Sequence, residues 1–133
     1  MHNRYDAFYL VLFSLYICIV NKTTILRFLF ICSANKQRSK TAEDFFSQKY
    51  LEHEFLSAGT NSKICRKEGT TELTEDLLEW ADRVYVMEKK HLDQIRKHNG
   101  SKYYSIINVL DIPDIYKYYD TDLIAILEEK VSF

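Results

Sequence analysis

A cysteine and an arginine stand at the two ends of a short polar segment that directly follows an apolar one. Residues 25–31 are apolar apart from Arg27, and the polar segment runs from Cys32 past Arg38 to Ser39. An apolar run rich in β-branched and aromatic residues, followed by small polar residues, predicts a strand, a tight loop and a helix. The amides of such a loop and of the first helical turn point at one place. This junction is therefore a predicted anion site.

Cys32 and Arg38 could carry chemistry at that site. A helix N-terminus and a guanidinium both favour a thiolate over a thiol, and a guanidinium can hold two phosphate oxygens in a fork. The alternatives are a small buried hydrophobic side chain for Cys32 and a solvated cation for Arg38. We favour chemistry, because a cation at the start of a helix opposes the helix dipole unless an anion binds there. A nucleophile beside a phosphate cradle predicts phosphoryl transfer through a phosphocysteine.

The pattern Cys32-x5-Arg38-Ser39 resembles the signature loop of the low-molecular-weight protein tyrosine phosphatases, and is most similar to a compact bacterial branch with a Cys-Ser-Ala-Asn loop. Three further segments, residues 39–43, 57–60 and 78–87, look like the family's first helix, the end of its second strand, and a later helix with its third strand. The resemblance spans residues 25–131 and implies a hydrolase that acts on phosphotyrosine or a small aryl phosphate monoester.

The resemblance implies roles for the loop residues. Cys32 would be the nucleophile, and Arg38 would bind the phosphate and stabilise the transition state. Ser39 could donate its hydroxyl to the Cys32 thiolate, although plain N-capping would also suit it. The expected phosphate-binding residues are Ser33, Ala34, Asn35, Lys36, Gln37 and Ser39. Asn35 is expected in a left-handed backbone conformation that turns the loop amides inward.

Three residues depart from the family pattern. Ala34 stands where many relatives have Gly, and Lys40 stands where Pro is usual. Gln37 replaces a second Cys that some relatives carry, so a protective disulfide at Cys32 is not expected. The resemblance implies neither a metal nor a cofactor.

Cleavage of a phosphate ester also needs a general acid that protonates the leaving oxygen. In the family this is an Asp in a late loop, and Asp114 matches it best, with Asp111 as the alternative. Asp120 is more simply read as a helix N-cap, and a turn or cap carboxylate is the alternative for all three. The aromatic residues of the same loop could wall the pocket or pack on the last helix; they are Tyr116, Tyr118 and Tyr119.

Composition limits the other function classes. The chain has 133 residues, enough for one domain with a core, and its net charge of −1 argues against a nucleic-acid-binding protein. Three cysteines without metal-type spacing indicate neither a disulfide framework nor a zinc site. The histidines show no triad or metal spacing. A thiolate enzyme belongs in a reducing compartment, so the cytoplasm is the expected location. We expect a monomer or a weak dimer.

Residues 1–24 form an apolar N-terminal extension whose role the sequence does not define, and residues 25–133 form the predicted phosphatase-like domain. Residues 7–20 carry no charge, but they are shorter than the roughly 20 residues that cross a bilayer. No small-residue cleavage site of a signal peptide follows them. We therefore favour a peripheral helix or an upstream translation start over membrane contact.

Hydrophobic periodicity predicts alternating strands and helices after residue 25. Strands are expected at residues 25–31, 53–57, 84–87 and 105–110, and helices at 39–50, from Thr71 or Thr74 to about 81, at 88–99 and after Asp120. Ser39 or Thr41 is the expected cap of the first helix, and the polar residues 61–70 are expected to form a loop. This order predicts an α/β three-layer sandwich, with a central four-stranded parallel sheet, helices on both faces and the phosphate-binding loop after the first strand.

Two rival functions remain open. A phosphate- or phosphopeptide-binding module without turnover would keep Arg38 and the loop but lack a placed acid. An arsenate reductase shares the family's fold and loop, but it needs additional cysteines to carry reducing equivalents, and Cys65 has no pair. The expected partner in the favoured case is a phosphorylated protein or a small phosphate ester.

Overall fold

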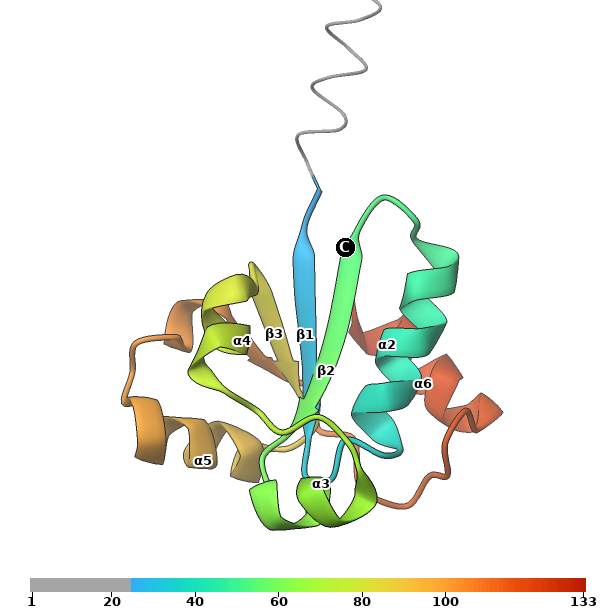
Figure 1. Ribbon diagram of the computed structural model, residues 1–133. Helices are drawn as coiled ribbons and strands as arrows, with labels where there is room; N and C mark the ends of the chain where they lie inside the picture. Colours follow the sequence, from blue (N-terminus) through green and yellow to red (C-terminus); the bar gives the residue numbers. More distant parts are fainter. Residues whose placement is uncertain (1–24) are drawn as a thin grey trace, which may run out of the picture.

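The computed structural model describes residues 25–133, and it arranges them around a four-stranded parallel sheet (Figure 1). The strand order is β2-β1-β3-β4. The strands are β1 (Arg27–Cys32), β2 (Glu54–Gly59), β3 (Arg83–Val86) and β4 (Ile107–Val109). The predicted parallel sheet is thus confirmed, with β1 in its interior. The predictions for residues 1–24 lie outside the described residues.

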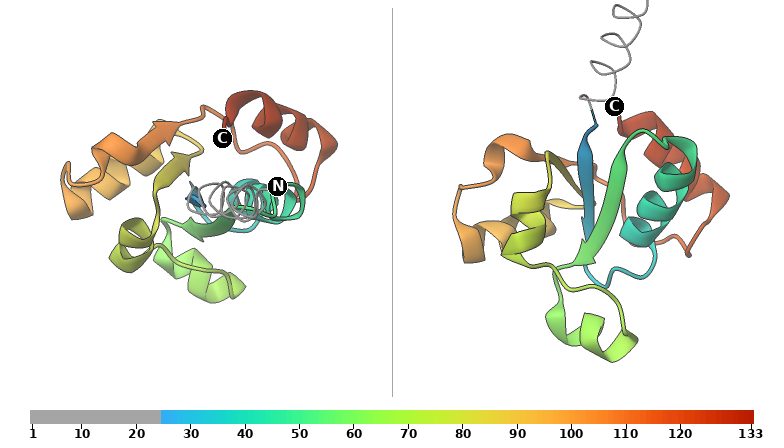
Figure 2. Two further views of the ribbon diagram at one scale, coloured as in Figure 1. Left: turned by 90° about the horizontal axis from the view of Figure 1, so that it is seen from above. Right: turned by 45° about the horizontal axis from the view of Figure 1, so that its top comes forward.

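Helices cover both faces of the sheet, as predicted. α2 (Arg38–Lys49) and α6 (Thr121–Lys130) lie on one face, and α4 (Glu75–Trp80) and α5 (Lys89–Asn99) lie on the other (Figures 1 and 2). α3 (Ser62–Glu68) lies beyond the carboxyl ends of the strands. No helix within residues 25–133 combines the length and apolarity needed to cross a bilayer.

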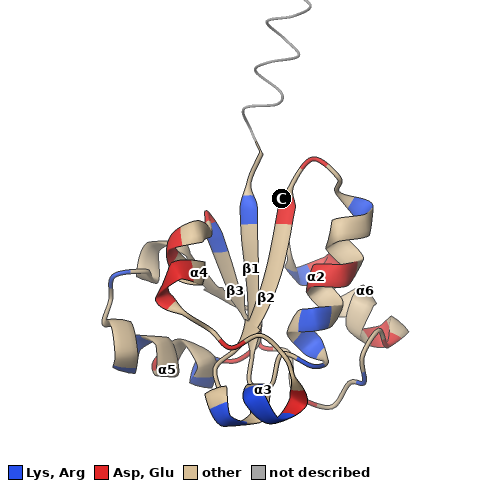
Figure 3. Ribbon diagram, viewed as in Figure 1, with Lys and Arg blue, Asp and Glu red and all other residues tan. Residues whose placement is uncertain are grey.

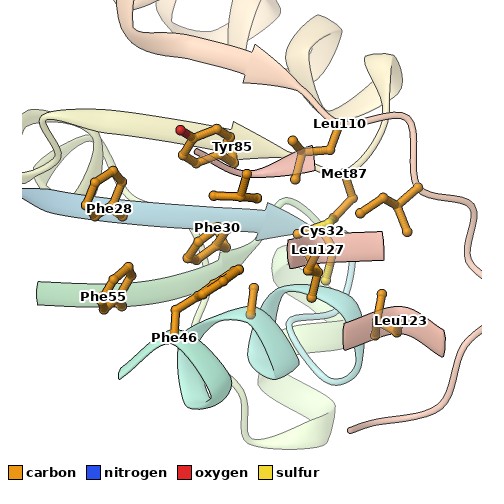
Figure 4. Packing of buried hydrophobic residues seen from close by; sticks show 13 residues of the cluster. Phe28, Phe30, Cys32, Phe46, Phe55, Tyr85, Met87, Leu110, Leu123 and Leu127 are labelled. Carbon is orange, nitrogen blue, oxygen red and sulfur yellow. The ribbon is translucent and has the colours of Figure 1, made fainter. Parts of the chain in front are cut away.

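The side chains of β1 enter two separate hydrophobic clusters because successive strand residues point to opposite faces. Phe28, Phe30 and Cys32 belong to the cluster under α2 and α6, while Leu29 and Ile31 belong to the cluster under α4 and α5. Burial on both faces explains why residues 28–31 are an unbroken apolar run. Figure 4 shows the first cluster, in which Cys32 lies at the end of β1 nearest the loop.

Two helix boundaries correct the sequence predictions. Neither Ser39 nor Thr41 caps α2; the helix begins at Arg38, and the preceding Gln37 makes no side-chain cap. The Ser39 hydroxyl instead contacts the Cys32 sulfur, and Thr41 accepts a hydrogen bond from the backbone amide of Tyr119. Both hydroxyls thus make contacts with residues outside α2 instead of capping its first turn. Thr74 and Asp120 do cap α4 and α6, as predicted.

The prediction of a loop at residues 61–70 is wrong, because this segment contains α3. The Asn61 side chain caps its start by accepting from the Ile64 amide, and Gly69 ends it with a left-handed φ of 70°. Cys65 is its one buried residue, so the segment lacks the apolar stripe from which a helix is normally predicted. The predicted strand at 105–110 is also shorter, since a 3₁₀ turn takes up Tyr104–Ile106.

Phe30 is an aromatic anchor of the first cluster, and replacing it should destabilise the fold. It is 0% exposed and stacks against Phe46, Phe55 and Tyr85 at ring-centroid distances of 5.6, 6.2 and 5.6 Å. We expect Phe30→Ala to lower the unfolding free energy by about 3–5 kcal/mol, because the cavity cannot collapse fully. Urea unfolding measures this. Leu51→Ala is the control, since Leu51 is 83% exposed; equal losses in both variants would contradict the described core.

Candidate active site

The loop between β1 and α2 encloses a small open pocket at the carboxyl edge of the sheet. Its volume is about 160 Å³, and it is lined by Cys32, Ser33, Ala34, Lys36, Gln37, Arg38 and Asp114. β1 lies between β2 and β3, so the chain leaves the sheet in opposite directions on its two sides. Ligands of open α/β sheets bind at such switch points. The pocket therefore lies at the position where the sheet topology predicts a ligand site.

Arg38 lines this pocket and is a buried cation. Its side chain is 1% exposed, and its Nη1 donates to Glu88 Oε2 at 2.6 Å and to the carbonyl oxygen of Ile112 at 2.8 Å. Among the described residues its Nε has no hydrogen-bond partner, although Asp114 Oδ1 lies 3.5 Å away. One end of the guanidinium is thus fixed by protein, while Nε remains available to an anion in the pocket.

The Cys32 sulfur lies 2.9 Å from the Ser39 hydroxyl. That hydroxyl accepts a hydrogen bond from Asn35 Nδ2, also at 2.9 Å, so its own proton is free to be donated. A thiolate can only accept hydrogen bonds. A thiolate at Cys32 would therefore accept a hydrogen bond from the Ser39 hydroxyl.

The Asn35 side chain links the loop to neighbouring segments through hydrogen bonds. Its backbone is left-handed, with a φ of 53°, as predicted. Its buried side chain also donates to Ser57 Oγ at 2.7 Å and accepts from the Thr71 amide at 3.2 Å. Asn35 thus ties the loop to β2 and to the segment before α4.

The loop carbonyls point away from the pocket. The Ser33 carbonyl accepts from the Asn61 amide at 2.9 Å, and the Ala34 carbonyl accepts from Thr70 Oγ1 at 2.6 Å. The Cys65 thiol of α3 also lies 3.6 Å from the Ala34 carbonyl oxygen. In a planar trans peptide the N–H opposes the C=O, so the next amides along the chain turn inward. Within residues 25–133, the amides of residues 33–37 donate to no protein acceptor. These amides can therefore donate together to one anion.

Two residues at the start of α5 belong to the site although the sequence did not indicate them. Glu88 pairs with Arg38, and this hydrogen bond holds the pKa of the Glu88 carboxyl below its ordinary value. His91 is buried, and burial, followed by the charges of Arg38 and Lys90, lowers its pKa to about 4. Their signal in the sequence was positional: both follow β3, whose carboxyl end meets the same sheet edge as the loop.

The two candidate acids lie in different places. Asp114 lines the pocket and is 58% exposed, so its carboxyl can meet a ligand from the solvent side. Asp111 does not line it; it lies in a separate hollow with Glu88, Lys89, Lys90 and Pro113. The structure thus brings Cys32, Arg38 and Asp114 together and leaves Asp111 apart.

The three tyrosines after Asp114 do not line the pocket. Tyr116 packs against the first hydrophobic cluster, and the Tyr118 hydroxyl bonds to the Asp44 carboxylate. Figure 3 shows Lys and Arg on α3 and at the start of α2, at the end of the molecule where the strands finish. Lys36 of the loop pairs with Glu68 of α3 at 3.2 Å.

Gly59 lies directly behind the loop, and a larger residue there should displace it. A Cβ at this position would lie 2.5 Å from the Ser33 carbonyl oxygen and from the Cys65 sulfur. We expect Gly59→Ala to weaken the binding of inorganic phosphate, because the carbonyl cannot move without turning the loop. Titration calorimetry measures the loss. Gly69→Asn is the control, since nothing lies within 4 Å of a Cβ there and Asn tolerates its left-handed backbone. Unchanged binding in Gly59→Ala would refute the close packing.

The buried, neutral His91 should make stability depend on pH. The pKa of His91 falls from 6.5 to about 4 on folding, so the unfolded chain binds the extra proton between these values. The stability that this group contributes is complete above pH 6.5 and is lost as the pH falls towards 4, by about 3 kcal/mol at most. We expect His91→Asn to flatten this part of the curve. Chemical unfolding between pH 4 and 7 measures it, and identical slopes in both proteins would count against a neutral buried His91.

Comparison with known proteins supports the fold. No family model and no curated protein matches the chain. Solved structures do match. Tyrosine phosphatase AmsI of Erwinia amylovora has 24% identity and a TM-score of 0.63, covering 80% of this chain and 89% of its own. The YwlE arginine phosphatase of Geobacillus stearothermophilus has 20% identity and a TM-score of 0.56, with coverages of 79% and 83%.

A third match is the low-molecular-weight phosphotyrosine phosphatase VcLMWPTP-2 of Vibrio cholerae O395. It has 19% identity and a TM-score of 0.55, and the alignment covers 74% of this chain and 84% of that one. The fold built on the parallel sheet β2-β1-β3-β4 is therefore similar to that of solved phosphatases. The chain has the fold of the low-molecular-weight tyrosine phosphatases.

Proposed function

We propose that the protein is a cysteine-dependent phosphatase that hydrolyses phosphotyrosine or a small aryl phosphate monoester through a phosphocysteine. One observation carries this proposal. The Cys32 sulfur, the buried Arg38 guanidinium and the free loop amides share one pocket with the exposed carboxyl of Asp114. This set supplies a nucleophile, an oxyanion site and an acid for one phosphate group.

In the first step, the Cys32 thiolate attacks phosphorus and the bond to the ester oxygen breaks. Protonated Asp114 gives its proton to the leaving oxygen, so the alcohol departs neutral. Arg38 Nε and the inward amides hold the equatorial oxygens, where charge gathers in the transition state. The Ser39 hydroxyl stabilises the sulfur anion before attack and again when the sulfur leaves.

In the second step, water attacks the phosphorus of phosphocysteine and the P–S bond breaks. The Asp114 carboxylate takes the proton of this water, which returns the acid to its starting state. Asp114 Oδ1 lies 3.5 Å from Arg38 Nε. A phosphate oxygen bound to Nε would take over this charge pairing and leave the carboxyl beside the ester oxygen.

The placement of Asp114 weighs against a binding module without turnover, since such a module needs no acid in its pocket. The arsenate reductase alternative needs a second cysteine that can attack Cys32. Cys65 is buried under the loop, and its thiol faces the backbone carbonyls of Ser33 and Ala34. We further propose a phosphorylated protein or a small phosphate ester as the partner. We propose the cytoplasm as the location, because the reactive thiolate needs a reducing compartment.

Replacement of the nucleophile should abolish turnover. We expect Cys32→Ser to lose nearly all hydrolysis of p-nitrophenyl phosphate, because a serine hydroxyl is a far weaker nucleophile here than a thiolate. We expect wild type to be inhibited by vanadate and unaffected by EDTA, since Arg38 and the amides supply the positive charge. Circular dichroism verifies that Cys32→Ser folds. Substantial residual turnover by this variant would overturn the phosphocysteine route.

Two aspartate variants test the acid. We expect Asp114→Asn to lower kcat by roughly 10²–10⁴-fold, because the leaving oxygen then departs without its proton. Asp111→Asn is the matched control and should retain wild-type kcat. The opposite pattern would move the acid role to Asp111. Phosphotyrosine and phosphoarginine peptides should be compared in the same assay, because one structural match is an arginine phosphatase.

A further inference from the structure

His91 connects the start of α5 to the phosphate loop through two hydrogen bonds. Its Nδ1 accepts from the backbone amide of Glu88 at 3.0 Å, and its Nε2 lies 2.9 Å from the Ser33 hydroxyl. The ring is 0% exposed, and Ser33 lines the pocket directly after Cys32. The mechanism described above uses neither side chain.

The Glu88 amide fixes the tautomer of His91. A backbone N–H can only donate, so Nδ1 must carry a lone pair, and the proton of a neutral ring must sit on Nε2. Burial among Arg38 and Lys90 disfavours the doubly protonated ring. Nε2–H is therefore a donor, and the Ser33 hydroxyl oxygen is its acceptor.

This direction leaves the proton of the Ser33 hydroxyl unused. A hydroxyl has a single proton to donate, and its contact with His91 occupies only a lone pair. Within residues 25–133, His91 is the only hydrogen-bond partner of Ser33 Oγ. Ser33 lines the same pocket as the Cys32 sulfur and the free amides, so its proton can be donated to an anion bound there.

We propose that His91 is a positioning residue that makes the Ser33 hydroxyl an additional donor to the bound phosphate. His91 holds the Ser33 oxygen, and the Ser33 proton joins the loop amides and Arg38 Nε around the oxyanion. The same ring accepts a hydrogen bond from the Glu88 amide, while the Glu88 carboxylate accepts one from Arg38 Nη1 at 2.6 Å. The start of α5 thereby fixes donors at both ends of the loop. This inference rests on the pocket of the proposed function.

The tautomer can be observed directly in the unmodified protein. We expect long-range ¹H–¹⁵N correlation spectra at pH 7 to show His91 as a neutral ring protonated at Nε2. We expect addition of inorganic phosphate to leave that tautomer in place. A ring protonated at Nδ1 would overturn the proposal, because Ser33 would then have to donate to His91.

A double-mutant cycle tests whether His91 acts through Ser33, with the dissociation constant of inorganic phosphate as the readout. We expect Ser33→Ala and His91→Asn each to weaken binding by about tenfold, since either change costs the hydrogen bond from Ser33 to a charged ligand. The double variant should be no weaker than Ser33→Ala alone. Additive losses, or unchanged binding in Ser33→Ala, would refute the coupling.

His91→Gln is the matched rescue for His91→Asn. The two variants differ by one methylene: the Asn amide lies near the position of Nδ1, whereas the longer Gln amide reaches the position of Nε2, the atom that contacts Ser33. We expect His91→Gln to bind phosphate nearly as well as wild type. Equal weakening in both variants would indicate that the ring matters for packing alone and would overturn the proposal. Binding of phosphate without hydrolysis of any ester would instead defeat the proposed function and leave this inference standing.

Discussion

The buried charge of Arg38 is the constraint on which the site depends. Removing a guanidinium from water costs several kcal/mol unless its donors are paired. Here the pairing comes from the Glu88 carboxylate after β3 and from the Ile112 carbonyl after β4. Two loops distant in sequence must therefore be in place before the cation can be buried. Among the described residues Nε has no hydrogen-bond partner, so this N–H can be donated to an anion in the pocket.

The parallel sheet makes this pairing possible. All four strands run in one direction, so the segments that follow β1, β3 and β4 meet at one edge. The loop with Cys32 follows β1, Glu88 follows β3, and Asp114 follows β4. Each chemical group stands within a few residues of a strand end. Rigid strands thus fix the relative positions of groups that flexible loops alone would not hold.

Much of this arrangement could be predicted because it follows from local rules. The apolar run 28–31 was sufficient to predict β1. The left-handed backbone of Asn35 could be predicted because few other residues tolerate that conformation. The resemblance favoured Asp114 over Asp111 as the candidate acid, and of the two only Asp114 lines the pocket with Cys32. α3 escaped detection because it presents a single buried side chain. Glu88 and His91 escaped because their partners, Arg38 and Ser33, lie 50 and 58 residues away.

The departures from the family pattern are accommodated by backbone geometry and by charge. The positive φ that the loop requires falls on Asn35, so Ala34 needs no glycine-like freedom. Lys40 places a second cation in the first turn of α2, where the dipole disfavours it. Its ammonium lies 2.9 Å from the Glu43 carboxylate and 3.3 Å from Asp44, one turn along the helix. These carboxylates pair with Lys40 and so offset the unfavourable interaction of its charge with the helix dipole, which makes the preset first turn of a proline unnecessary at this position.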